Sequence, residues 1–73
     1  MPRKGMKLKR LRIDLGWTQK MLAKEAGLDP TIVSRAERGV NISAPSAKKI
    51  ADAFSRAYSK EILVGDIEDL NVE

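Results

Sequence analysis

Four side chains with hydrogen-bonding chemistry fall on one face if residues 30–38 form a helix, because an α-helix turns by about 100° per residue. They are Thr31, Ser34, Arg35 and Arg38, and no acidic residue shares this face with them. Each arginine has a permanent positive charge and a fork of donors that fits phosphate or the edge of a guanine. The hydroxyls fit either a base or a phosphate. The pattern is typical of a surface that meets a polyanion, and also of a solvated helix face that happens to carry two arginines.

Strong helix signals surround these side chains. Asp29 is a good N-cap, and Pro30 suits the first helical position, where no amide donor is needed. Gly39 can end the helix. Val33 and Ala36 lie on the opposite face and can seat the helix on an apolar core. The sequence therefore predicts a helix over about residues 30–38 that buries one face and presents the other.

A second short helix is predicted directly before this one. Thr18 has N-cap chemistry, and Trp17 can pack on Leu22 at the spacing of a hydrophobic staple. Gly27 ends this helix and permits the backbone geometry of a tight corner. Residues 18–39 are thus predicted to form two helices joined by one corner, a unit with which small proteins place a helix in the major groove of DNA.

Two or three further helices are expected around this pair. One covers about residues 6–15, with leucines at i, i+3 and i+7. Another opens at Pro45 or Ser46 after a loop, and a last short helix is capped by Ser59 and ends near Gly65. The sequence contains no convincing strand. The predicted fold class is therefore all-α, a bundle of four to five short helices.

Charge is unevenly distributed along the 73 residues. The net charge of +4 combines a basic part up to Ser59, with 13 Lys/Arg against 5 Asp/Glu, and an acidic part from Lys60 onward, with 1 against 5. We divide the chain into a basic N-terminal arm (residues 1–5), a helical domain (6–65) and an acidic tail (66–73). The tail is weakly patterned, so we expect it to be frayed or ordered only by a partner. A basic body attracts polyanions, mainly by releasing counterions from phosphate.

The composition argues against several function classes. The chain has neither cysteine nor histidine, which excludes disulfides and thiolate metal sites and leaves no obvious group that titrates between about pH 5 and 8. With no phosphate-cradling glycine loop either, we expect no catalytic residue, cofactor or metal site, and hence no enzyme. Asp66, Glu68 and Asp69 do not match the spacing of a calcium loop. No apolar run of about 18 residues occurs, so no membrane span is expected, and the lack of cysteine fits a reducing cytoplasm.

A family resemblance rests on two segments of the helix pair. The first is Thr-Gln-x-x-Leu-Ala at residues 18–23, and the second is Ser-Arg-Ala-Glu-Arg-Gly at residues 34–39, with Gly27 between them. Together they resemble the Cro and phage-repressor, or xenobiotic-response-element-like, helix-turn-helix family. The similarity covers about residues 8–63. The resemblance implies a lambda-repressor-like bundle.

The resemblance also implies roles for single side chains. In the family, an arginine of the first helix pairs with a glutamate near the end of the third, and the matching residues here are Arg12 and Glu37. Gln19, on the first turn of the second helix, would contact phosphate with the support of the amides and positive dipole of that helix end. The alternative for Glu37 and for Gln19 is an exposed side chain with no fixed partner.

The same resemblance implies the residues that meet DNA: base-reading positions at Thr31, Ser34 and Arg35, a phosphate contact at Arg38, and the wider set Gln19, Pro30, Thr31, Ser34, Arg35, Arg38, Asn41 and Ser43. Ile32 either meets a thymine methyl or covers the edge of the core.

The loop after Gly39 departs from the family pattern. The family often carries basic residues there that grip the DNA backbone, whereas this loop has no lysine or arginine and is one residue longer. Only Asn41, Ser43 and backbone amides can supply such contacts. Val40 and Ile42 can instead face a second subunit.

These features predict a sequence-specific DNA-binding transcriptional regulator, in the form of a repressor, located in the cytoplasm. We expect it to act on double-stranded DNA as a homodimer that reads a pseudo-palindromic operator through the helix at about residues 30–38. The alternative is an antitoxin or protein-interaction subunit with the same fold, whose tail engages a protein through Ile67, Leu70 and Val72. Two roles are open for the basic N-terminal arm, contact with the duplex and solubility alone.

Overall fold

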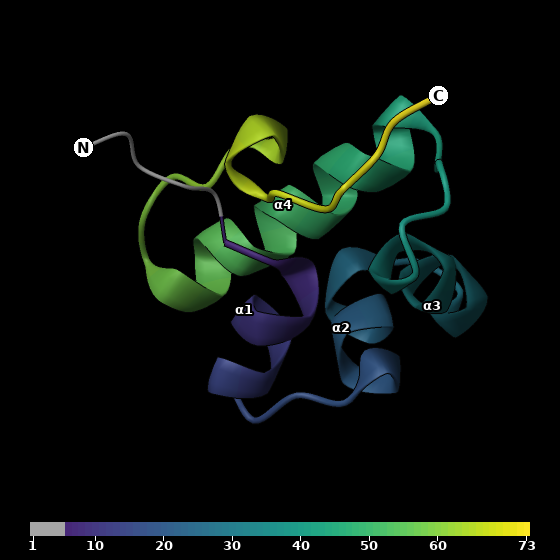
Figure 1. Cartoon of the computed structure of the whole chain (residues 1–73). Helices are drawn as coiled ribbons and strands as arrows, with labels where there is room; N and C mark the ends of the chain where they lie inside the picture. The colour runs from purple at the N-terminus through teal and green to yellow at the C-terminus, as the bar shows by residue number, and fades with distance from the viewer. Residues whose placement is uncertain (1–5) are drawn as a thin grey trace.

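The computed structural model describes residues 6–73, so the predicted N-terminal arm lies outside it. The described part contains four α-helices, α1 (Leu8–Asp14), α2 (Gln19–Ala26), α3 (Pro30–Glu37) and α4 (Ala44–Tyr58), and one 3₁₀ turn, η1 (Val64–Asp66) (Figure 1). Its only β-structure is a pair of isolated bridges. The predicted all-α class is confirmed. None of the helices in residues 6–73 has the length and apolarity needed to cross a bilayer.

The core forms where α4, the longest helix, crosses the shorter ones (Figure 1). Phe54 of α4 is fully buried, and the ring of Trp17 stacks on it with 6.3 Å between centroids and 16° between planes. The ring of Tyr58 is tilted by 55° to that of Phe54, with 6.4 Å between centroids. The Tyr58 hydroxyl donates to the Leu11 carbonyl at 2.7 Å, which ties the end of α4 to α1. Burial of the apolar faces of all four helices in one cluster stabilises the bundle.

The helix ends around the corner agree with the predicted caps. The Thr18 hydroxyl accepts from the Met21 amide at 3.1 Å, and the Asp29 carboxylate accepts from the Thr31 amide at 2.8 Å. Gly27 follows α2 with φ of 71°, in the left-handed region that favours glycine. These local bonds fix where α2 and α3 begin.

Two expectations about the ends of α4 are wrong. Ser43 is the N-cap, accepting from the Ser46 amide at 3.3 Å, so α4 begins at Ala44 rather than at Pro45 or Ser46. Ser59 does not open a further helix, because it adopts φ of 54° and ends α4. The segment that follows forms only the short turn η1, since nucleating a helix is too costly for so few residues.

The tail is folded against the domain, so the expectation of a frayed end is wrong. Ile67 is only 2% exposed and belongs to the core cluster, as does Leu70. Ile67 also forms a parallel bridge with Met6, and Val72 forms one with Ile42. The burial of Ile67 and Leu70 offsets the entropy lost when the tail is ordered.

The tail connects two parts of the chain that are distant in sequence. The Asp69 carboxylate accepts from the amide of Leu8, at the start of α1, at 2.8 Å. The Asn71 side chain donates to the Gly39 carbonyl, directly after α3, at 3.0 Å. In Figure 1 the yellow C-terminal segment runs past α4 towards the loop that leaves α3. The tail therefore holds the start of α1 and the end of α3 in one arrangement.

Candidate nucleic-acid interface

The inward face of α3 is seated in the core. Val33 and Ala36 are fully buried, and half-buried Ile32 packs against the core cluster. Of the two roles left open for Ile32, the structure favours cover for the edge of the core. Burial of these three side chains fixes the rotation of α3 about its own axis, and with it the face that α3 presents to solvent.

The outward face of α3 carries the four predicted residues. Thr31, Arg35 and Arg38 are exposed, and Ser34 is half-buried. Arg38 follows the last turn as the C-cap, so the set spans about 10 Å along the helix at 1.5 Å per residue. That length matches about three steps of a DNA duplex. The two guanidinium groups and two hydroxyls therefore form one continuous donor surface.

An acidic residue, Asp29, lies at the start of α3. The sequence predicts for it only the role of an N-cap. The Asp29 side chain is exposed, and the hydrogen bond from the Thr31 amide holds its pKa below the ordinary value of 3.8. The carboxylate is therefore anionic at neutral pH. It can accept from an amino group such as that of cytosine, whereas it repels phosphate.

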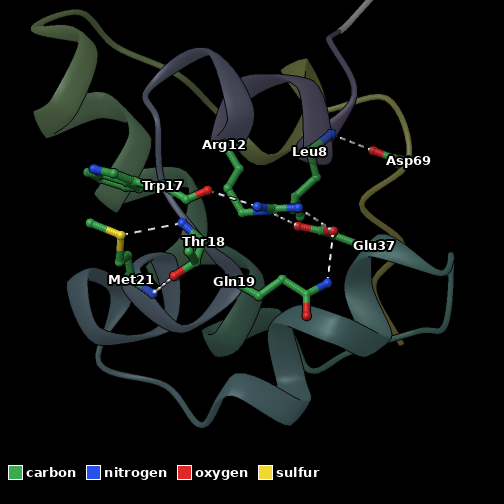
Figure 2. Close-up of polar contacts among 8 residues, drawn as sticks. All are labelled: Leu8, Arg12, Trp17, Thr18, Gln19, Met21, Glu37 and Asp69. Carbon is green, nitrogen blue, oxygen red and sulfur yellow. Dashed lines mark hydrogen bonds and ion pairs between the residues drawn. The ribbon is translucent and has the colours of Figure 1, made fainter.

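A buried ion pair fixes α3 against α1 (Figure 2). Arg12 donates from Nε to Glu37 Oε2 at 2.5 Å and from Nη2 to Oε1 at 3.2 Å, and the two side chains are 11% and 6% exposed. Arg12 Nη1 also donates to the Trp17 carbonyl at 2.8 Å. The structure thus contains the pair that the resemblance implied. Because removing both charges from water is costly, such a pair contributes orientation more than net stability.

The Gln19 amide joins the same carboxylate from the first turn of α2. Gln19 Nε2 donates to Glu37 Oε1 at 3.0 Å, and the side chain is half-buried (Figure 2). A glutamine amide has two N–H donors and one carbonyl, so one donor and the acceptor are left for another group. The first-turn amides of Gln19 and Lys20 have no acceptor within the helix. Gln19 is therefore held at a helix end that attracts anions, in an orientation that the sequence did not predict.

The other predicted contacts lie at the two ends of α3. Pro30 is exposed at the first position of the helix, and Asn41 and Ser43 are exposed in the loop beyond its last turn. The Ser43 hydroxyl is committed to α4, since it accepts from the Ser46 amide and donates to Ser46 Oγ at 2.9 Å. Asn41 thus has the freer polar side chain of the two.

Two of the acidic tail residues, Asp66 and Asp69, have structural partners. The Asp69 carboxylate caps α1, and the Asp66 carboxylate accepts from the Leu63 amide at 3.0 Å. Among residues 6–73, no three side chains of the histidine, cysteine, aspartate or glutamate type gather in a way that could hold a metal ion.

Comparison with protein families finds a match. The model of a helix-turn-helix family matches residues 8–57, from the first residue of α1 to the penultimate residue of α4. Neither the curated proteins nor the solved structures yield a match. The matched range contains the corner, the buried ion pair and the donor surface of α3.

Proposed function

Because the chain belongs to the helix-turn-helix family of the Cro/C1 type and has its all-helical, lambda-repressor-like fold, we propose that it is a transcriptional repressor that reads a specific DNA sequence. Members of this family are DNA-binding regulators. Our proposal adds that this chain represses transcription and that it recognises a specific sequence. The sequence-specific mode rests on one observation: the Arg12–Glu37 pair and the buried face of α3 direct Thr31, Ser34, Arg35 and Arg38 outward together. The repressor role rests on the resemblance to Cro and the phage repressors.

In this mechanism α3 enters the major groove of the duplex. Thr31, Ser34 and Arg35 reach the edges of the bases, and an arginine can bind a guanine through two hydrogen bonds. Arg38 lies at the far end of the helix and binds phosphate. Pro30 lies at the near end, where the first turn of α3 approaches the bases.

Phosphate on the flanking backbone meets the first turn of α2. There the free donor of Gln19 and the first-turn amides bind one phosphate, while Glu37 keeps the glutamine side chain in place. Asn41 supplies a further contact beyond α3, and Ser43 can add one when its hydroxyl leaves Ser46 Oγ. The Asp29 carboxylate repels phosphate at the N-terminus of α3. The contacts to the DNA backbone are therefore made by α2 and by the C-terminal end of α3.

We further propose that two copies bind together. Two α3 helices about 34 Å apart would read two half-sites one helical turn apart on one face of the duplex. The operator would then be pseudo-palindromic, and the cytoplasm would be the place of action.

The alternative of an antitoxin or protein-interaction subunit has less support. It would use apolar side chains of the tail, and both Ile67 and Leu70 are buried within the chain itself. A partner would have to displace them from the core. Only Val72 of this set is substantially exposed.

Selection of bound sequences from a random DNA pool tests the proposal. We expect a palindromic consensus, and we expect its affinity to fall steeply as salt is raised from 50 to 200 mM, roughly a thousandfold for about six phosphate contacts. A random duplex bound as tightly as every selected site would contradict sequence-specific recognition.

A further inference from the structure

A groove with a volume of about 430 Å³ lies along α2 and the turn that leads into α3, and we name it the α2 groove. Four of the residues that line it are apolar: Met21, Ala23, Leu28 and Pro30. Ala23 is buried and Leu28 is half-buried, whereas Met21 is 47% exposed. The groove therefore presents apolar surface that an occupant would remove from water.

The charged residues that line the α2 groove are both lysines. Lys20 and Lys24 are exposed, and neither takes part in an ion pair among residues 6–73. They are four residues apart on α2, so they share one face of the helix and lie about 6 Å apart along its axis. Asp29, which precedes Pro30, does not line the groove, and its carboxylate is used as the cap of α3. The positive charge of the groove is thus not offset by an acidic side chain in its lining.

We propose that the α2 groove binds an acidic segment of another protein. The complementary segment has an apolar side chain that covers Met21 and Leu28, and two carboxylates that pair with Lys20 and Lys24. An amphipathic helix with acidic residues at i and i+4 presents its carboxylates at the spacing of the two lysines. Burial of the apolar side chain supplies affinity, and the charges select an acidic segment over a basic one.

The apolar part of the groove favours a protein over the other candidates for its lysines. A DNA backbone would pair with the two ammonium groups but would leave Met21 uncovered. Residues 1–5 of this chain carry two basic residues and no acidic one, so they do not complement the groove. The chain's own acidic tail is folded on the domain, with Ile67 and Leu70 in the core cluster. The complementary segment therefore belongs to a different protein.

The α2 groove adjoins the proposed phosphate site. Lys20 directly follows Gln19 in the first turn of α2, and Figure 2 shows the side chains of Gln19 and Met21 extending to different sides of this turn. An acidic segment in the groove would place negative charge within about 10 Å, one Debye length, of a phosphate bound at Gln19. The segment and the duplex should therefore oppose each other's binding, so the partner would release the protein from DNA. This antagonism rests on the proposed function, whereas the docking does not.

Selection from a displayed library of random short peptides tests the docking on the full chain without DNA. The most enriched peptide is synthesised, and its Kd is measured by fluorescence anisotropy. The variant Lys20→Glu/Lys24→Glu reverses the charge of the groove, and Lys49→Glu/Lys60→Glu is the matched control at two exposed lysines outside it. Met21→Gln removes the apolar side chain, yet a glutamine there can still accept from the Thr18 amide, as the Met21 sulfur does at 3.4 Å. Circular dichroism checks that each variant is folded.

We expect the enriched peptides to combine acidic residues with a large apolar one. Lys20→Glu/Lys24→Glu should weaken binding about tenfold or more, because like charges then meet in the groove. Met21→Gln should weaken it severalfold through lost apolar burial, and the control variant should bind as the wild type does. A saturating concentration of the peptide should lower the affinity for a selected duplex.

Several results would overturn the docking: no enrichment of acidic peptides, binding retained by Lys20→Glu/Lys24→Glu, or an equal loss in the control variant. Full affinity of Met21→Gln would also overturn it, because the apolar surface would then not be covered. A peptide that binds in the groove and leaves the affinity for DNA unchanged would overturn the antagonism. If no duplex is preferred over random DNA, the proposed function fails instead, and the peptide measurements, which contain no DNA, still decide the docking.

Discussion

The side-chain amide of Gln19 lies 3.0 Å from the carboxylate of Glu37, which also pairs with Arg12. One carboxylate thus joins the end of α1, the start of α2 and the end of α3. Since Gln19 is the proposed phosphate contact and α3 the proposed reading helix, the same buried group positions both.

Removing one partner of the ion pair should destabilise the fold strongly. Glu37→Gln leaves the Arg12 guanidinium buried without a counter-charge, and we expect the free energy of unfolding to fall by about 3–5 kcal/mol. Replacing both residues with methionine should recover much of this loss. Urea denaturation of the single and double variants measures the difference, and a single variant that loses less than about 1 kcal/mol would show that the pair is well solvated.

The corner between α2 and α3 should depend on Gly27. Nothing lies within 4 Å of an added Cβ there, so the cost of Gly27→Ala comes from its positive φ of 71° alone and should be about 1–2 kcal/mol. Gly65→Ala is the control, because that site is equally open and has no positive φ. Thermal unfolding compares the two variants. If they are equally stable, the positive φ of Gly27 imposes no cost on alanine.

Arg35 and Arg38 should contact different parts of the DNA, Arg35 a base and Arg38 a phosphate. Arg35→Ala should cost about 1–3 kcal/mol on the selected site and relax the preference at one base pair. Arg38→Ala should instead weaken all sequences alike and lower the magnitude of the salt slope by about one. Binding titrations on matched and mismatched duplexes at several salt concentrations separate these outcomes, and a uniform loss for Arg35→Ala would make it a phosphate contact.

The tail should contribute to global stability. Ile67 is buried in the core, and truncation to alanine should lower the free energy of unfolding by about 2–5 kcal/mol. Glu68→Ala changes the exposed neighbour and should have little effect. If chemical denaturation finds the two variants equally stable, the packing of the tail does not hold in solution.

The shifted pKa values of Asp29 and Tyr58 should make stability depend on pH in the acidic and the alkaline range. The lowered pKa of Asp29 contributes stability that is present above its ordinary value of 3.8 and is lost as pH falls through the lowered value. Burial, together with nearby Asp14, raises the pKa of Tyr58 above 10.0, so its contribution is present below pH 10.0 and is lost as pH rises through the raised value. Urea midpoints measured from pH 3 to 11 test this, and Tyr58→Phe should remove part of the alkaline change.

The features of this protein that could be predicted from its sequence are local ones. The caps at Thr18 and Asp29 and the left-handed turn at Gly27 depend on bonds and dihedral angles within a few residues. The outward face of α3 follows from the period of the helix once Val33 and Ala36 are taken as buried. For these reasons the helix pair and its candidate donor surface were predictable.

The features that could not be predicted depend on contacts between residues far apart in the chain. The packing of the tail depends on hydrogen bonds to the start of α1 and to the loop after α3, which no local pattern reveals. The bond from Gln19 to Glu37 depends on how two helices cross. The chain leaves the helical path at Ser59, and Ile62 beyond it is buried in the core. Burial and long-range hydrogen bonds outweigh weak local propensity in each case, because propensity contributes only tenths of a kcal/mol per residue whereas burial of one side chain contributes about 1.5–3 kcal/mol.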